Sequence, residues 1–164
     1  MMALVSRNLK VYFRDRASVF FSLLAVLIIL GLYVLFLGDV MMQEFSGVPG
    51  AKALSDSWIM SGILAVISVT TVLGAYGTMV DDRVHKIIKD FSASPLGRGK
   101  LAGSYIVSSF VVGSIMTLLA FALSEVYIVA RGGTLLSLAQ AAKVIGIILL
   151  SALSNTAMIS FLVS

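Results

Sequence analysis

The sequence predicts an all-α, polytopic membrane protein, and three observations lead to that prediction. Of the 164 residues, 59% are apolar and only 12% are charged, against about 25% charged residues in ordinary soluble domains. The mean hydropathy is +1.05. A soluble domain of this size could not hide so much apolar surface, because small domains bury only about two-thirds of their chain area. The apolar residues also gather in four uncharged stretches, each long enough to cross a bilayer.

These four stretches are predicted to be transmembrane helices. They contain 22, 23, 24 and 21 residues, which at 1.5 Å per residue gives roughly 31–36 Å, enough for a hydrocarbon core of about 30 Å. The backbone must be helical because lipid offers no water to satisfy open peptide groups. The strict alternation of a β-barrel strand is absent. The predicted spans are 17–38, 58–80, 101–124 and 144–164.

Basic residues are distributed unevenly between the connecting segments. Only three of the basic residues lie in the first and third loops. By the positive-inside rule, the N-terminus and the second loop are expected in the cytoplasm. Nine lie in the N-terminal segment and the second loop: Arg7, Lys10, Arg14, Arg16, Arg83, Lys86, Lys89, Arg98 and Lys100.

The N-terminal segment, residues 1–16, is expected to form an interfacial helix along the membrane surface. Arg7, Lys10 and Arg14 recur at i, i+3 and i+7, and Phe13 lies with other apolar residues on a different face. Such a helix buries its apolar face in the interface while its cations reach lipid phosphates. The alternative is a basic flank that only orients the first span.

The loop 81–100 is longer than a plain connector requires. Val84, Ile87, Ile88 and Phe91 stand at i, i+3, i+4 and i+7, so they predict a short amphipathic helix. Pro95 would stop that helix. Two interpretations remain open: a helix resting on the membrane surface, and a docking element for a cytoplasmic partner.

Residues that commonly carry catalysis are scarce. The chain has no cysteine and a single histidine, so thiolate chemistry and histidine-based metal sites are excluded. No phosphate-binding loop with its Gly-Lys-Ser/Thr ending occurs. We therefore expect no catalytic, cofactor-binding or metal-ligating residue, no cofactor in this chain and no enzymatic activity. Twelve basic residues are also too few to indicate a nucleic-acid-binding protein.

Polar uncharged residues occur inside the spans. Ser68, Thr71 and Asn155 are candidates either for lining a pathway or for close helix packing, which is the usual role of small and hydroxyl residues in membranes. Glu125 lies at the outer edge of the third predicted span. It is expected to be a solvated carboxylate at the interface, with a gate as the alternative.

Two blocks of sequence resemble a known family. The first is Arg7-Asn8-Leu9-Lys10 followed by Phe13-Arg14-Asp15-Arg16, and the second is Ser94-Pro95-Leu96-Gly97-Arg98 before the third span. With the acidic and basic helix after the second span, they resemble a type-2 ABC exporter permease. Many members of that family carry a glycine a few residues after the acidic and arginine pair, where this chain has His85 and Lys86.

The resemblance implies a function and a set of partners. The chain would be the permease subunit of an ATP-driven exporter in a bacterial plasma membrane, moving a drug, peptide or lipid-linked substrate. ATP would be hydrolysed by a separate ATP-binding cassette ATPase subunit, and a second permease domain would complete a homo- or heterodimer. The loop would be a coupling helix, with these ATPase contacts: Asp82, Arg83, Val84, Lys86, Ile87, Ile88, Lys89, Asp90, Phe91 and Pro95.

The family usually has six spans and this chain offers four, so residues 1–164 are expected to be a single incomplete transmembrane domain, truncated at its C-terminus. The alternative function is a non-transporting membrane adaptor or assembly protein, which would recruit a cytoplasmic partner through the same basic loop.

Overall fold

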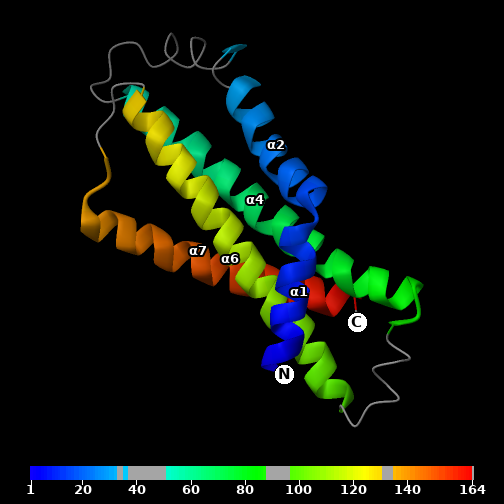
Figure 1. The fold of residues 1–164 in the computed structure, drawn as a ribbon. Coiled ribbons are helices and arrows are strands. Elements are labelled where there is room, and N and C mark those ends of the chain that lie inside the picture. Colours follow the sequence, from blue (N-terminus) through cyan, green and yellow to red (C-terminus); the bar gives the residue numbers. More distant parts are fainter. Residues whose placement is uncertain (33–34, 37–50, 88–96, 131–134, 164) are drawn as a thin grey trace.

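The computed structural model describes residues 1–32, 35–36, 51–87, 97–130 and 135–163, and all regular structure in these ranges is helical. The prediction of an all-α fold is therefore confirmed for the described part of the chain. Figure 1 shows its main helices, which are α1 (Met2–Arg14), α2 (Arg16–Leu32), α4 (Ala51–Val84), α6 (Arg98–Ala130) and α7 (Leu138–Val163).

Three of these helices are long and apolar enough to cross a membrane. They are Leu54–Val84, Gly99–Ala130 and Leu138–Val163, and they contain the second, third and fourth predicted spans up to residue 163. The first predicted span, 17–38, begins in α2, whose 17 described residues end at Leu32. Residues 33–34 and 37–38 lie outside the described residues. Three helices thus have the length and composition of membrane spans, and the first span stays a prediction.

Helix α4 is the centre of the bundle. Its buried residues Met60, Ile63 and Ile67 pack against Ala120 of α6. Closer to its C-terminal end, Val72 and Tyr76 form a second cluster with α7. Figure 1 shows α4 and α6 running side by side while α7 crosses them. The two antiparallel helices and the crossing helix therefore enclose the core.

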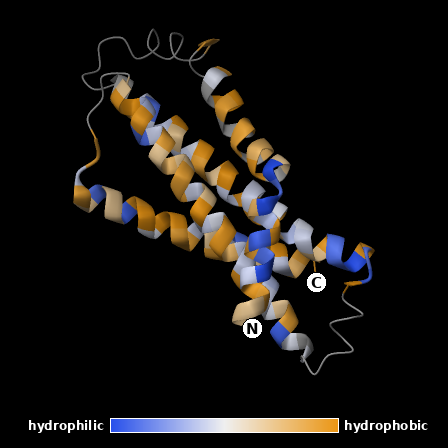
Figure 2. Cartoon of the chain, viewed as in Figure 1, coloured by the Kyte–Doolittle hydropathy of each residue, from blue (hydrophilic) through white to orange (hydrophobic). Residues whose placement is uncertain are grey.

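Apolar side chains also cover the outside of the bundle, as expected of a protein whose solvent is lipid. Leu150 and Phe161 of α7 are 68% and 82% exposed, and Leu73 of α4 is 56% exposed. In Figure 2, hydrophilic residues gather near the α1–α2 junction and in the last turns of α4. We call this end of the bundle the basic end.

The first two helices meet at Asp15. Helix α1 ends at Arg14, and the Asp15 carboxylate accepts the backbone N–H of Ala17 at 3.1 Å. This bond satisfies a free donor in the first turn of α2, as an N-cap does. Asp15 thus stops one helix and caps the next, so α1 and α2 can point in different directions (Figure 1).

The loop 81–100 differs in part from its prediction. Helix α4 continues as far as Val84, and Lys86 then adopts φ 60°, a left-handed conformation that ends helices. Residues 84–87 therefore do not belong to one uninterrupted amphipathic helix, because the chain turns at His85 and Lys86. The remaining residues of the predicted helix, and the proline expected to end it, lie outside the described residues. They are Ile88, Lys89, Asp90, Phe91 and Pro95.

Candidate functional site

A polar network at the basic end joins three helices around one carboxylate. Arg7 of α1 forms an ion pair with Asp82 of α4, with Nη1 2.5 Å from Oδ2. A second bond runs from Nη2 to Oδ1 at 2.8 Å. The Tyr105 hydroxyl of α6 also donates to Asp82 Oδ2, at 2.5 Å. Both carboxylate oxygens are thus satisfied, in the two-pronged geometry that makes arginine–carboxylate pairs strong.

A neighbouring bond extends this network along α1. The Asn8 side-chain amide donates to Ser108 Oγ of α6 at 3.3 Å, and Arg7 Nη1 donates to Asn8 Oδ1 at 3.2 Å. Asn8 is 4% exposed, and with Val5 and Tyr12 it forms the buried face of α1. Helix α1 is therefore fixed to α6 by polar bonds and by apolar packing.

Burial makes the charges of this network interdependent. Asp82 is only 3% exposed, and a buried carboxylate is costly unless a cation and hydrogen bonds compensate for lost hydration. The hydrogen bond to Asp82 raises the pKa of Arg7 above its ordinary value, although burial of the guanidinium opposes the increase. The Arg7 guanidinium is thus the cation that compensates the buried Asp82 carboxylate.

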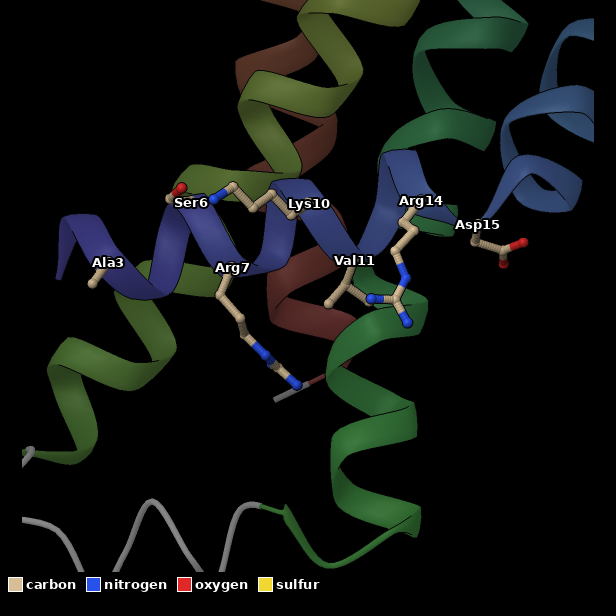
Figure 3. Close-up of a pocket in the computed structure, with 7 residues that line it drawn as sticks. All are labelled: Ala3, Ser6, Arg7, Lys10, Val11, Arg14 and Asp15. Carbon is tan, nitrogen blue, oxygen red and sulfur yellow. The ribbon is translucent and has the colours of Figure 1, made fainter.

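The outward face of α1 carries the remaining cations of the predicted interfacial helix. Lys10, Phe13 and Arg14 are exposed. Lys10 and Arg14 line an open hollow of about 690 Å³ along the helix together with Arg7, and Figure 3 shows Arg7 and Arg14 extending from the same edge of α1. Arg7, grouped with them in the sequence prediction, differs from them because it is also paired with Asp82.

The predicted ATPase-contact residues divide into buried and exposed positions. Asp82 faces Arg7 and Tyr105, so its carboxylate is not available at the surface. Arg83, Val84 and Lys86 are exposed, and Arg83 donates to the backbone carbonyl of Val163 at 3.3 Å. Ile87 is partly exposed. The last turn of α4 thus meets the end of α7 and still leaves apolar and basic groups accessible.

The three polar candidates inside the spans have different environments. Asn155 of α7 donates to Ser68 Oγ of α4 at 2.9 Å. Thr71 is fully buried and donates to the Ile67 carbonyl of its own helix at 2.7 Å, a usual way to satisfy a hydroxyl in lipid. Ser68 and Asn155 therefore join two helices, whereas Thr71 fills the helix contact.

Within the described ranges, no group of three or more acidic, histidine or cysteine side chains could hold a metal ion. Comparison of the chain with protein-family models, curated proteins and solved structures finds no match. A functional proposal must therefore rest on the residues themselves.

Sequence reasoning missed three members of the polar network: Asn8, Tyr105 and Ser108. The sequence does contain a signal for Asn8, because this polar residue lies between Val5 and Tyr12 on the face that α1 buries. A polar residue in an apolar stripe indicates a buried hydrogen bond. The sequence contains no such signal for Tyr105. It lies 23 residues from Asp82, and only the antiparallel pairing of α4 and α6 brings the two side chains together.

Proposed function

We propose that the chain is part of the permease subunit of an ATP-driven exporter, in which the basic end faces the cytoplasm and receives the ATPase. The observation that supports this proposal best is the network around Asp82. It joins the two helices that flank the loop 85–97, which are α4 at its end and α6 at its start, and it ties both of them to α1. Any force applied to that loop would act on all three helices together.

The exposed groups near the loop suit a docking surface. Val84 and Ile87 provide apolar contact, and Arg83 and Lys86 provide positive charge. In the proposed mechanism, closure of the ATPases pushes on this surface, and the network passes the movement into α4 and α6. A second permease domain would complete the pathway. In this proposal the buried Asp82 holds the three helices together, and its exposed neighbours contact the ATPase.

Charge reversal tests the docking role. We expect Lys86→Glu with Lys89→Glu to reduce co-purification with the ATPase subunit of the proposed exporter and to reduce ATP-dependent export. Lys143→Glu is the matched control, since Lys143 is an exposed lysine of α7 far along the chain from the loop. If the double reversal leaves both co-purification and export at the level of the control, the docking proposal is wrong.

The cations exposed on α1 support a second candidate function, a membrane adaptor that recruits a cytoplasmic partner without transport. Lys10 and Arg14 lie beside the exposed Phe13. An adaptor would retain its partner whether or not ATP is present, and no substrate would stimulate hydrolysis. Substrate-stimulated ATP hydrolysis by the purified complex therefore distinguishes the exporter from the adaptor.

A further inference from the structure

A groove lies between the three membrane-length helices, near the end opposite to the basic end. It consists of two cavities of about 280 Å³ and about 190 Å³. Both are lined by Ser61 and Leu64 of α4 and by Val144 of α7, so they adjoin each other. Together they reach the size range of small-molecule sites, about 300–1,000 Å³. We call this space the α4–α6–α7 groove.

One end of the groove holds a carboxylate in a fixed position. Glu125 lines the larger cavity, and its Oε2 accepts the backbone N–H of Leu136 at 3.2 Å. The other carboxylate oxygen keeps its capacity to accept. Glu125 is partly exposed, so the solvated interface carboxylate expected from the sequence also borders a cavity. None of the described residues that line the groove is basic.

The rest of the groove is mainly apolar with a few hydroxyls. Leu64, Ile147 and Ile148 provide aliphatic walls. Ser68 lies at the inner end, and its hydroxyl oxygen already accepts a hydrogen bond from Asn155. Among the described residues that line it, the groove therefore offers one charged side chain, Glu125, at one end and apolar surface along its length. An acidic group on a membrane-length helix, beside an apolar groove, is a functional-site candidate whose partner should be cationic.

We propose that the α4–α6–α7 groove binds an organic monocation with an apolar body, such as a quaternary ammonium or phosphonium compound. The cation would lie beside Glu125, and the apolar body would extend toward Ile147 and Ile148. Binding stands on the geometry of the groove alone. The further step, that such cations are the exported substrates, rests on the proposed exporter function.

Tetraphenylphosphonium is a suitable probe, because tetraphenylborate has the same shape and the opposite charge. Binding is measured by equilibrium dialysis against the 164-residue chain in lipid nanodiscs, with empty nanodiscs as the background. We expect saturable binding of the cation and none of the anion. Glu125→Gln keeps an acceptor for Leu136 and removes the charge, so it should weaken binding about tenfold, or roughly 1.4 kcal/mol.

Two further variants complete the test. Ser61→Phe fills the space shared by both cavities and should weaken binding at least as much, without touching the carboxylate. Asp81→Asn removes an exposed carboxylate at the basic end and should leave the affinity within about twofold. No ATPase takes part in this binding measurement. A negative binding result therefore does not contradict the exporter proposal, and a negative co-purification result does not contradict cation binding in the groove.

Three results would overturn the proposal. One is the absence of saturable cation binding above empty nanodiscs. Another is equal affinity of wild type and Glu125→Gln, which would show that the carboxylate attracts no cation. The third is a dimer that Ser61→Phe converts to a monomer, because the groove would then be filled by a second copy of the chain.

Discussion

Gly113 of α6 lies directly against Val72 of α4. A Cβ atom built on Gly113 would come within 2.4 Å of Val72 Cγ2, closer than carbon atoms approach in folded proteins. Val72 is itself fully buried, so it cannot move aside. The contact sets how near the two central helices approach, in the way that small residues do in membranes.

We expect Gly113→Ala to destabilise the bundle by about 1–3 kcal/mol, the usual cost of overpacking. Gly62→Ala is the matched control, because a Cβ there meets nothing within 4 Å. Alanine is also the better helix former, so the control should be neutral or slightly stabilising. Unfolding in mixed micelles measures both, and equal stability of the two variants would show that α6 can shift away from Val72.

Arg7→Ala should leave a buried carboxylate without its cation. Loss of one partner from a fully buried pair costs roughly 3–5 kcal/mol. The Arg7 side chain is 32% exposed, so we expect about 2 kcal/mol after allowance for solvent screening. The free energy of unfolding is the measurement. Arg14→Ala, on the exposed face of the same helix, should change it by less than about 0.5 kcal/mol, and Asp82→Asn should partly restore Arg7→Ala.

Tyr105→Phe removes the second donor to Asp82 and should cost roughly 1.5–3 kcal/mol, the range for hydrogen bonds to charged groups. Because Arg7 and Tyr105 bond the same carboxylate, their effects should not be additive. A double-mutant cycle with Arg7→Ala checks this, and a coupling energy near zero would mean that the two donors act separately.

The bond between Asn155 and Ser68 should contribute little stability despite its depth. Interhelical hydrogen bonds in membranes average about 0.6 kcal/mol, and we expect Asn155→Ala and Ser68→Ala each to cost that much. The double variant should cost no more than either single one. Additive losses in the same unfolding assay would indicate that the two side chains have other partners.

Lys86→Gly should stabilise the end of α4. Its φ of 60° costs a residue with a Cβ roughly 1–2 kcal/mol, a cost that glycine avoids, partly offset by glycine's larger freedom when unfolded. We expect a net gain of about 0.5 kcal/mol. Lys86→Ala removes the same charge but keeps the Cβ, so it should give no gain; an equal gain would assign the effect to charge.

The sequence predicted the helical fold because hydropathy and length are local properties of a stretch of chain. The spans 58–80 and 101–124 lie inside α4 and α6, whose ends extend beyond them. At the C-terminal end of α4, Asp81, Asp82 and Arg83 continue the helix past the apolar core, whereas the sequence pattern had assigned these residues to the loop 81–100.

Gly99 and Gly103 are four residues apart in the sequence, the spacing that is typical of glycines at a helix contact in membranes. In the structure Gly103 meets only the side chain of Met1, and a Cβ on Gly99 meets nothing within 4 Å. The close approach occurs at Gly113 instead. Spacing alone could not select among the glycines, because which one faces α4 depends on how the two helices are rotated against each other.

The sequence by itself determined that this chain is helical and membrane-embedded, and which segments carry its charge. Long apolar stretches favour helices in a membrane whatever the final packing of those helices is. Only the tertiary structure decided that Asp82 is buried, that Arg7 is paired with it and that Glu125 borders a groove. Each of these roles depends on contacts between residues far apart in the chain, and the direction of a charged side chain is fixed by the neighbour that best offsets its lost hydration.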